Sequence, residues 1–204
     1  MLKEDLLREA VLKNNTVLIL YFSRHGSVAA LAEKIAVGVV AAGATAMIRT
    51  VPNLNPDFNS DYPALHPLIE KDELIQADAL ALGSPVRFGL MAAEMKAFWD
   101  NTSDLWLKGQ LIDKPAGVFT SSSSMHGGNE ATLLGMMLPL LHHGMVLLGI
   151  PYEEPALHQT QTGGTPYGPT HVSGSIATTL LSAHEQQLAI SFGKRLATIA
   201  GKLS

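Results

Sequence analysis

Three short segments of the sequence combine small polar residues and glycine, two of them include an arginine, and each directly follows a hydrophobic run. They are SRHGS at 23–27, GSPVRFG at 83–89 and TSSSSMHGGN at 120–129. Free backbone N–H groups, hydroxyls and the positive end of a helix dipole suit a phosphate monoester. The serines of the first segment can donate hydrogen bonds, and Gly26 lets the backbone approach a ligand closely. An ordinary turn capped by Ser27 is the plainer alternative, but the other two segments favour a nucleotide-like ligand.

Alternating strand-like and helix-like segments must position these loops. The sequence predicts strands at 16–22, 45–51, 78–83, 115–120 and 145–150, and helices from 27 to a stop at Gly43, at 68–76, 92–100 and 129–142, and after Ser182. Such alternation predicts parallel strands joined by right-handed crossovers, with helices on both faces of a doubly wound α/β sandwich. Ligands of such folds bind at the carboxyl ends of the strands, where all three polar segments should lie.

Local signals mark some boundaries of these elements. Ser27 is a plausible N-cap, and Ser182 with Glu185 forms a capping box ahead of the last helix. The stretches 52–67 and 151–175 are rich in Pro, Gly, Asn and Ser, so we expect loops there. The second is long enough to suggest a function.

Composition limits the possible functions. A chain of 204 residues that is 47% hydrophobic and 16% charged can bury the core of one globular domain. A net charge of −4 without a basic block makes nucleic acid an unfavourable partner. The absence of cysteine excludes disulfides and thiolate sites and is compatible with a reducing compartment. Residues 1–15 are an N-terminal extension, for which we expect a short amphipathic helix, with a disordered or vector-derived tail as the alternative. We expect no membrane span and a cytoplasmic location.

Several known motifs are absent from the sequence. The first strand is not followed by G-x-G-x-x-G, and neither G-x-x-x-x-G-K-[ST] nor G-x-S-x-G occurs. The acidic pocket that a response-regulator receiver needs is missing after the first strand. The eight histidines include no H-E-x-x-H, and His142 and His143 are adjacent, so they point in different directions on a helix. We therefore expect no metal site.

Five segments, taken in order, resemble one known family. SRHGSVAALA, SPVRFG, the Ser- and Gly-rich loop after the fourth strand, LLHHGM and GGTPYG are similar to segments of the WrbA-type NAD(P)H:quinone oxidoreductases. The resemblance extends over the chain from Thr16 onward. It implies a flavodoxin-like FMN-binding domain over 16–204, with a five-stranded parallel sheet and helices on both faces.

The resemblance also implies where FMN would bind. Its phosphate would lie in the Ser23–Val28 loop, and its isoalloxazine ring between the 86–88 loop and the 121–128 loop. His142 matches a family histidine beside the flavin, whereas His143 is expected to pack internally. The implied cofactor-binding residues are Ser23, Arg24, His25, Gly26, Ser27, Val28, Pro85, Val86, Arg87, Phe88, Gly89, Ser121, Ser122, Ser123, Ser124, Met125, His126, Gly127, Gly128 and His142.

Substrate binding is implied for two residues. Trp106, in DLWLKG, matches an aromatic residue that the family places over the flavin, and His25 lies beside the same slot. A half-buried surface aromatic residue and a histidine that complements the dipole at the C-terminal end of a helix are the structural alternatives for Trp106 and His142. The chain departs from the family at Arg24 and His25, where uncharged or aromatic residues are usual, and in SSSSMHGG, where the family has more Thr and Gly.

The resemblance implies an enzyme rather than a binding module. NADH or NADPH would reduce FMN, and FMN would reduce a quinone to a hydroquinone by two-electron, ping-pong hydride transfer, with no obligatory catalytic side chain. A flavodoxin-type electron carrier and a non-enzymatic flavin-bound interaction protein are the alternatives. The family's GGTPYG segment helps to build a homotetramer, so we expect a tetramer here, with a dimer as the alternative.

Overall fold

The computed structural model describes residues 15–54 and 65–203. The helix expected in 1–15 and most of the loop expected at 52–67 therefore lie outside the described residues. The elements are β1 (Thr16–Tyr21), α2 (Ser27–Ala41), β2 (Thr45–Thr50), α3 (Lys71–Gln76), β3 (Ala79–Pro85), α4 (Ala93–Asp100), α5 (Ser103–Leu107), β4 (Pro115–Ser122), α6 (Asn129–His142), β5 (Val146–Leu147), α7 (Ala156–Gln159), β6 (Thr170–Val172) and α8 (Ala183–Leu203).

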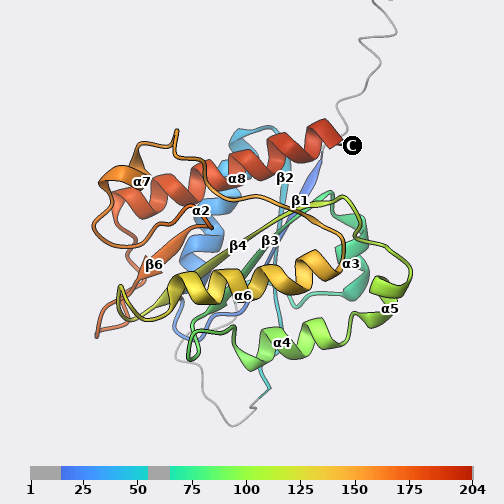
Figure 1. Ribbon diagram of the computed structural model, residues 1–204, viewed down its shortest axis with the longest axis horizontal. Helices are drawn as coiled ribbons and strands as arrows, with labels where there is room; N and C mark the ends of the chain where they lie inside the picture. Colours follow the sequence, from blue (N-terminus) through green and yellow to red (C-terminus); the bar gives the residue numbers. More distant parts are fainter. Residues whose placement is uncertain (1–14, 55–64, 204) are drawn as a thin grey trace, which may run out of the picture.

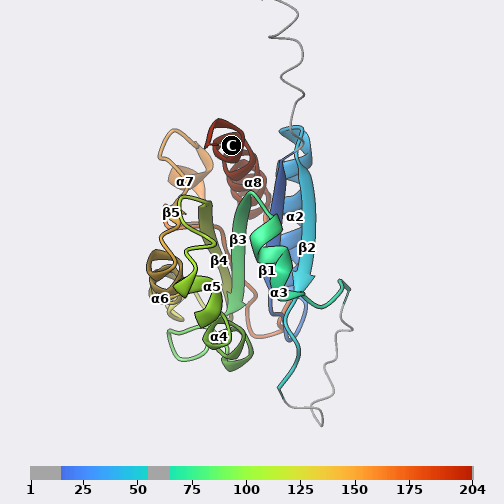
Figure 2. The same ribbon diagram turned by 90° about the vertical axis from the view of Figure 1, so that its right-hand side faces the viewer.

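The strands form one parallel sheet in the order β2-β1-β3-β4-β5, with β6 also paired to β4. Figure 2 shows the main strands side by side and running in one direction. Helices α2, α7 and α8 cover one face, and α3 to α6 cover the other (Figure 1). Val17 to Leu20 in β1 are fully buried, as expected for a central strand. The predicted flavodoxin-like doubly wound fold is confirmed.

The fifth strand is split into two short pieces. β5 pairs with Pro115 and Ala116 at the start of β4, whereas β6 pairs with Thr120 to Ser122 at its end. The chain leaves the sheet edge between them and forms α7. The predicted strand at 145–150 is therefore too long, and the prediction that 151–175 is only loop is wrong. A strand of three residues has no recognisable alternation, which is why the sequence did not indicate β6.

The observed ends of the helices show which of the predicted caps and stops are correct. Gly43 ends α2 as predicted: its N–H donates to the Val40 carbonyl at 2.9 Å with a φ of 81°. Ser182 and Glu185 form the predicted capping box. Ser27 is not the N-cap of α2, because Gly26 holds that position with a φ of 88°. The predicted helix at 68–76 starts later, at Lys71, since Glu70 caps it.

Helices α2 and α8 approach so closely that glycine is required on both. A Cβ atom on Gly193 would collide with the backbone carbonyl of Ile35, and one on Gly38 would collide with that of Ile190. This contact holds α2, and with it the loop that precedes it, against the C-terminal helix.

We expect Gly193→Ala to lower the free energy of unfolding by about 1–3 kcal/mol, because the added methyl group meets rigid backbone. Urea denaturation at fixed protein concentration measures the change. Gly135→Ala is the matched control: its Cβ would lie 3.7 Å from Leu90 Cδ2, so it should leave stability unchanged or raise it by up to about 1 kcal/mol. Equal effects of the two substitutions would contradict this account of the helix contact.

Candidate functional site

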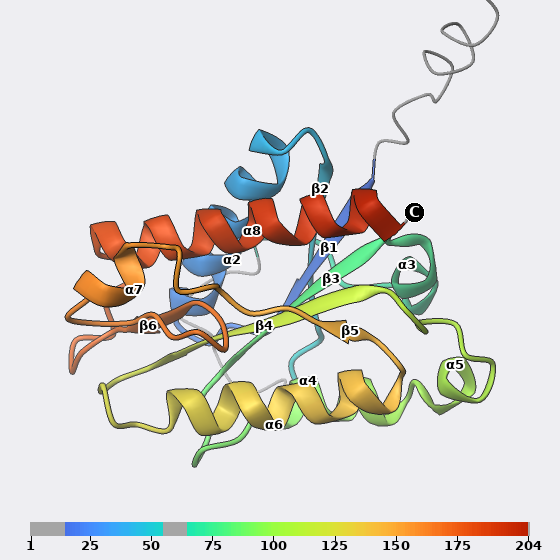
Figure 3. The same ribbon diagram turned by 45° about the horizontal axis from the view of Figure 1, so that its top comes forward.

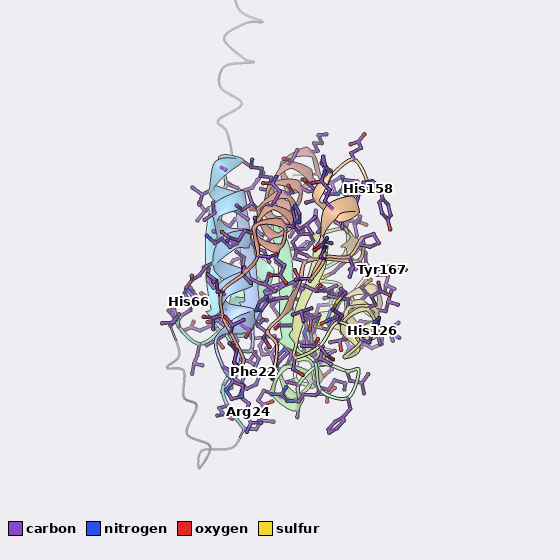
Figure 4. All side chains as sticks on the ribbon, turned by 90° about the vertical axis from the view of Figure 1, so that its left-hand side faces the viewer. Phe22, Arg24, His66, His126, His158 and Tyr167 are labelled. Carbon is purple, nitrogen blue, oxygen red and sulfur yellow. The ribbon has the colours of Figure 1, made fainter. Side chains whose placement is uncertain are left out.

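A cavity of about 620 Å³ lies at the carboxyl ends of β1, β3 and β4. The three polar segments singled out in the sequence meet there. Figure 4 shows Phe22 and Arg24 on the segment that leaves β1 at this end of the sheet. The lining residues are Ser23, Arg24, His25, Ser27, Val28, Pro85, Val86, Arg87, Phe88, Ser121, Ser122, Ser123, Gly127, Ser173, Gly174, Ser175 and Ala177. The cavity adjoins the point between β1 and β3 where the strand order reverses, which is where doubly wound folds bind ligands.

The first wall is the turn from β1 into α2. Ser23 Oγ accepts the N–H of Gly26 at 3.1 Å, and the first helical hydrogen bond runs from Ala30 N–H to the Gly26 carbonyl at 2.9 Å. The N–H groups of the first helical turn therefore point out of the helix toward the cavity end. Ser27 differs from the expectation, because its hydroxyl donates to the carbonyl of Thr178 at 3.2 Å. The backbone of this turn, rather than the Ser27 hydroxyl, is available to an anion.

The second wall is the turn after β3. Arg87 and Leu90 exchange backbone hydrogen bonds of 2.8 and 3.0 Å around Phe88 and Gly89, both of which have a positive φ. A phenylalanine rarely adopts this conformation, so the surrounding contacts must hold it there. The ring of Phe88 is fully exposed. The turn thus presents a large apolar surface at the mouth of the cavity.

Buried hydroxyl groups fix this turn to the sheet. Ser84 Oγ accepts the N–H of Ala92 at 2.8 Å, and the Thr120 hydroxyl donates to the Ser84 carbonyl at 2.6 Å. Both side chains are fully buried. Hydrogen bonds that are both buried and satisfied favour a single loop conformation.

The third wall is the loop from β4 to α6. The Ser122 hydroxyl donates to the Ser124 carbonyl at 2.7 Å, which folds the loop on itself. A Cβ on Gly128 would lie 3.0 Å from the Cα of Gly89, so the second and third walls touch where both carry glycine. This contact leaves no room for a side chain between the two loops.

Two guanidinium groups give the cavity a positive potential. Burial lowers the pKa of Arg87, the nearby positive charge of Arg24 lowers it further, and Glu94 opposes both. The Arg87 Nη1 donates to the Val86 carbonyl at 2.9 Å, which keeps the side chain against the turn. Positive charge together with the start of α2 suits a ligand that carries phosphate.

A fourth wall, which the sequence did not assign to the site, consists of residues 173–177 after β6. Ser173 donates its backbone N–H to the Ser122 carbonyl at 2.9 Å, which joins this segment to the third wall. The signal in the sequence was the Ser/Gly run VSGS. Its position could not be derived, because β6 was not predicted.

The other expected site residues lie outside the lining of this cavity. Gly26, Gly89 and Ser124 belong to its walls, whereas Met125, His126 and Gly128 border a neighbouring cavity of about 480 Å³. Neither His142 nor Trp106 lines the cavity of its own chain. α6 begins two residues after Gly127, which lines the cavity. From there it runs along the sheet toward α5 (Figure 3). Its 14 residues, at about 1.5 Å each, put His142 roughly 20 Å from the start of the helix.

His143 has a structural role, as expected. It is buried, its ring packs against Trp99 at 5.3 Å between centroids, and its Nε2 lies 3.0 Å from the Thr102 hydroxyl. Burial lowers its pKa, and so does the charge of the neighbouring His142. A neutral His143 therefore fixes the C-terminal end of α6, and His142 is exposed beside it.

A buried ion pair lies behind the fourth wall. His171 Nδ1 is 3.0 Å from Glu185 Oε2, and the two side chains are 1% and 2% exposed. Burial opposes the charge on His171, but the hydrogen bonds to Glu185 and to the Thr178 carbonyl outweigh it and raise its pKa. Burial likewise opposes the charge on Glu185, but hydrogen bonds from His171, Ser182 and Val172 lower its pKa to about 2.

Among residues 15–54 and 65–203, no group of three or more His, Cys, Asp or Glu side chains could hold a metal ion. In the same ranges, no helix is long and apolar enough to cross a membrane.

Comparison with known proteins identifies a matching family and relatives of similar sequence. The family model described as NADPH-dependent FMN reductase matches residues 15–152. A protein of Gluconacetobacter diazotrophicus named NAD(P)H dehydrogenase (quinone) is 41% identical over 197 residues, covering 92% of this chain and 98% of that protein. A Rhizobium rhizogenes protein of the same name is 39% identical with the same coverage.

Solved structures show the same fold. A WrbA-like flavodoxin from Agrobacterium tumefaciens superposes with a TM-score of 0.65 at 24% identity, covering 94% of this chain and all of that one. An oxidised flavodoxin from Bacillus cereus gives a TM-score of 0.58 at 15% identity, covering 90% of this chain and 98% of the other.

The His171–Glu185 pair predicts how stability changes with pH. The raised pKa of His171 means that its contribution is complete below 6.5 and is lost as pH rises through the folded value. The lowered pKa of Glu185 means that its contribution is complete above 4.5 and is lost as pH falls toward 2. We expect the free energy of unfolding contributed by the pair to be greatest between these limits.

Urea denaturation from about pH 3 to about pH 9 measures this profile. His171→Gln should remove the alkaline decline, whereas His184→Gln, which changes the neighbouring part-exposed histidine, should retain it. An alkaline decline that survives in His171→Gln would contradict the assignment.

Proposed function

Because the chain belongs to the family of NADPH-dependent FMN reductases, we propose that it is an FMN-dependent NAD(P)H:quinone oxidoreductase. It would reduce quinones to hydroquinones in a two-electron, ping-pong reaction. The observation that carries the proposal is the cavity at the β1–β3 switch point, where a helix start, two guanidinium groups and an apolar turn meet. Relatives that share about two-fifths of its residues over nearly their whole length carry the name of this activity.

The residues of the cavity fit FMN. Its volume of about 620 Å³ lies within the range typical of small-molecule sites. The N–H groups at the start of α2, together with Ser23 and Gly26, would hold the phosphate. The 86–88 turn and the 121–128 loop would hold the isoalloxazine ring from two sides.

When bound, FMN supplies the hydride and electron chemistry, so the protein needs no obligatory acid or base. The chain's own contribution is to orient the ring and to adjust the charge around it. Arg87, fixed against the Val86 carbonyl, would stabilise negative charge near the ring. Phe88 would exclude water from the ring edge.

We further propose that the enzyme works as a homotetramer of D2 symmetry. His142 and Trp106 lie away from the cavity of their own chain, so a role for them beside FMN requires a neighbouring subunit. The surface around them is apolar: Leu134, Leu138 and Leu141 recur along one side of α6 and are about half exposed. Leu107, at the end of α5, is 76% exposed. Apolar patches of this kind are typical of subunit contacts.

GGTPYG supports the same assembly. The Ile150 N–H donates to the Pro166 carbonyl at 2.9 Å, which holds the segment against the sheet edge and leaves Tyr167 38% exposed. Figure 4 shows Tyr167 near the outer surface. A rigid, part-exposed tyrosine is favourable at an interface. A cytoplasmic location also remains part of the proposal, supported by the lack of cysteine.

Steady-state kinetics test the activity. With oxygen excluded, the FMN-loaded protein should oxidise more than one equivalent of NADH or NADPH per flavin only when a quinone such as benzoquinone is present. Double-reciprocal plots should give parallel lines because donor and acceptor use one slot in turn. Protein without FMN is the control. Negligible oxidation of both nucleotides by the FMN-loaded protein would contradict the enzyme proposal and favour an electron carrier.

Light scattering after size exclusion tests the assembly. We expect four chains per particle, with Leu138→Lys dissociating the particle and weakening FMN binding, since each site would lose its neighbour's residues. Tyr167→Ser should act in the same direction. The matched control is Val40→Lys on α2, where the valine is similarly exposed at 62% but lies on the other face of the sheet. A monomeric FMN-loaded protein with full activity would overturn this part of the proposal.

A further inference from the structure

Residues 173–178 form a closed loop between β6 and α8. The Thr178 N–H donates to the Ser173 carbonyl at 2.9 Å, which closes the loop, and Ala177 within it has a φ of 51°. An alanine rarely adopts this conformation, so other contacts must hold the loop in place. The cavity is lined by four residues of this loop, Ser173, Gly174, Ser175 and Ala177.

Two hydrogen bonds from different elements meet at one carbonyl of this loop. His171 Nε2 lies 2.9 Å from the Thr178 oxygen, and the Ser27 hydroxyl donates to the same oxygen at 3.2 Å. Ser27 begins α2, whose N–H groups face the phosphate end of the cavity. The Thr178 carbonyl therefore joins the buried His171 to the turn that would hold the phosphate.

We propose that the buried His171–Glu185 ion pair is a positioning unit that fixes the 173–178 loop against the first turn of α2 and thereby sets the affinity of the cavity for the phosphate end of its ligand. This inference rests on the proposed function in one respect, which is that the phosphate belongs to FMN. The pair does not line the cavity, so it acts through the Thr178 carbonyl and not by contact with the ligand.

The hydrogen-bond pattern requires His171 to be charged. A carbonyl oxygen can only accept, so Nε2 must carry a proton to bond Thr178. The Glu185 carboxylate already accepts backbone N–H groups from Gly163 at 2.9 Å, Val172 at 3.1 Å and Ser182 at 2.7 Å. Three such donors favour the ionised carboxylate, so Nδ1 must also donate. A neutral imidazole has one N–H and would leave one of the two acceptors without its donor.

The charged groups around His171 are few. Glu185 is the one that α8 directs at it, with part-exposed His184 preceding it along the helix. β4, which pairs with β6, has no titratable side chain between Pro115 and Ser122, and the first turn of α2 has none either. Arg24 and His25, which precede α2, line the cavity. The protonation of His171 is therefore set mainly by Glu185 and by pH.

Loss of the proton should loosen the loop. Either the Thr178 carbonyl or Glu185 would then lose a hydrogen bond in a buried setting, where an unmade bond is costly. The loop would separate from Ser27, and the wall at the phosphate end of the cavity would become less ordered. The affinity for a ligand with a phosphate should therefore fall, whereas the affinity for a ligand without a phosphate should not change.

Flavin binding to the FMN-free protein tests the proposal, with FMN and riboflavin as probes and quenching of flavin fluorescence as the signal. Titrations run between about pH 7 and about pH 9.5, above the second pKa of a phosphate monoester near 6, so the charge of the phosphate stays constant. We expect FMN affinity to fall roughly tenfold over this range while riboflavin affinity stays level. Because both probes carry the same ring, titration of the ring cancels in the comparison.

His171→Gln separates positioning from simple stability. It should have FMN affinity roughly tenfold lower at neutral pH, unchanged riboflavin affinity and no remaining pH dependence of the ratio. His184→Gln should behave like the original protein. Equal loss of FMN and riboflavin binding in His171→Gln, or a ratio that is independent of pH in the original protein, would overturn the proposal.

A measurement without flavin keeps the two proposals apart. Amide hydrogen exchange of residues 173–182 in the FMN-free protein should be faster in His171→Gln than in His184→Gln, whereas exchange in α6 should be equal. If neither flavin binds, the proposed function fails, and this comparison still decides whether the pair holds the loop. Equal exchange of 173–182 in both variants would overturn the positioning role. If His171→Gln does not fold, the pH dependence of FMN affinity relative to riboflavin affinity in the unsubstituted protein decides whether the pair has this role.

Discussion

Pairing along both edges of β4 is the constraint on which the rest of the structure depends. On one edge β4 pairs with β3, which aligns Ser84 with Thr120 and brings the second and third walls of the cavity together. On the other edge it pairs with β5 at its start and β6 at its end. The second pairing brings residues 173–177 to the cavity and places His171 beneath them. Without β6 the cavity would lack its fourth wall.

Local patterns predicted most of the fold because they depend on neighbouring residues. The unbroken apolar run of β1, the length of α6 and the Ser182–Glu185 capping box are all visible within a few residues of sequence. Three of the walls followed from a general rule, since the carboxyl ends of parallel strands share one edge. The split of the fifth strand has no such signal, because its two pieces are too short to show a period and are joined only through β4.

The side-chain partners in the site were harder to predict than its location. The Ser27 hydroxyl was expected to face a ligand, but it donates to Thr178, which is 151 residues further along the chain. His171 and Glu185 are separated by a loop without regular structure, and nothing in the sequence marks either as buried. His142 and Trp106 show a related limit. Their motifs predicted a place beside the ligand, but neither residue lines the cavity of its own chain, and a motif does not indicate the three-dimensional position of its residues.

The His171–Glu185 pair is difficult to explain as a source of stability alone. Burying two charges costs solvation free energy, and replacing such a pair with apolar side chains is often neutral or stabilising by about 1–4 kcal/mol. An apolar pair could fill the same space between β6 and α8, but it could not donate to the Thr178 carbonyl or accept the backbone N–H groups of Gly163 and Val172. Those bonds give the polar pair a directional role, because each fixes a particular backbone group. Since one of those groups also bonds to Ser27 at the start of α2, the geometry of the cavity depends on a charge that the ligand does not touch.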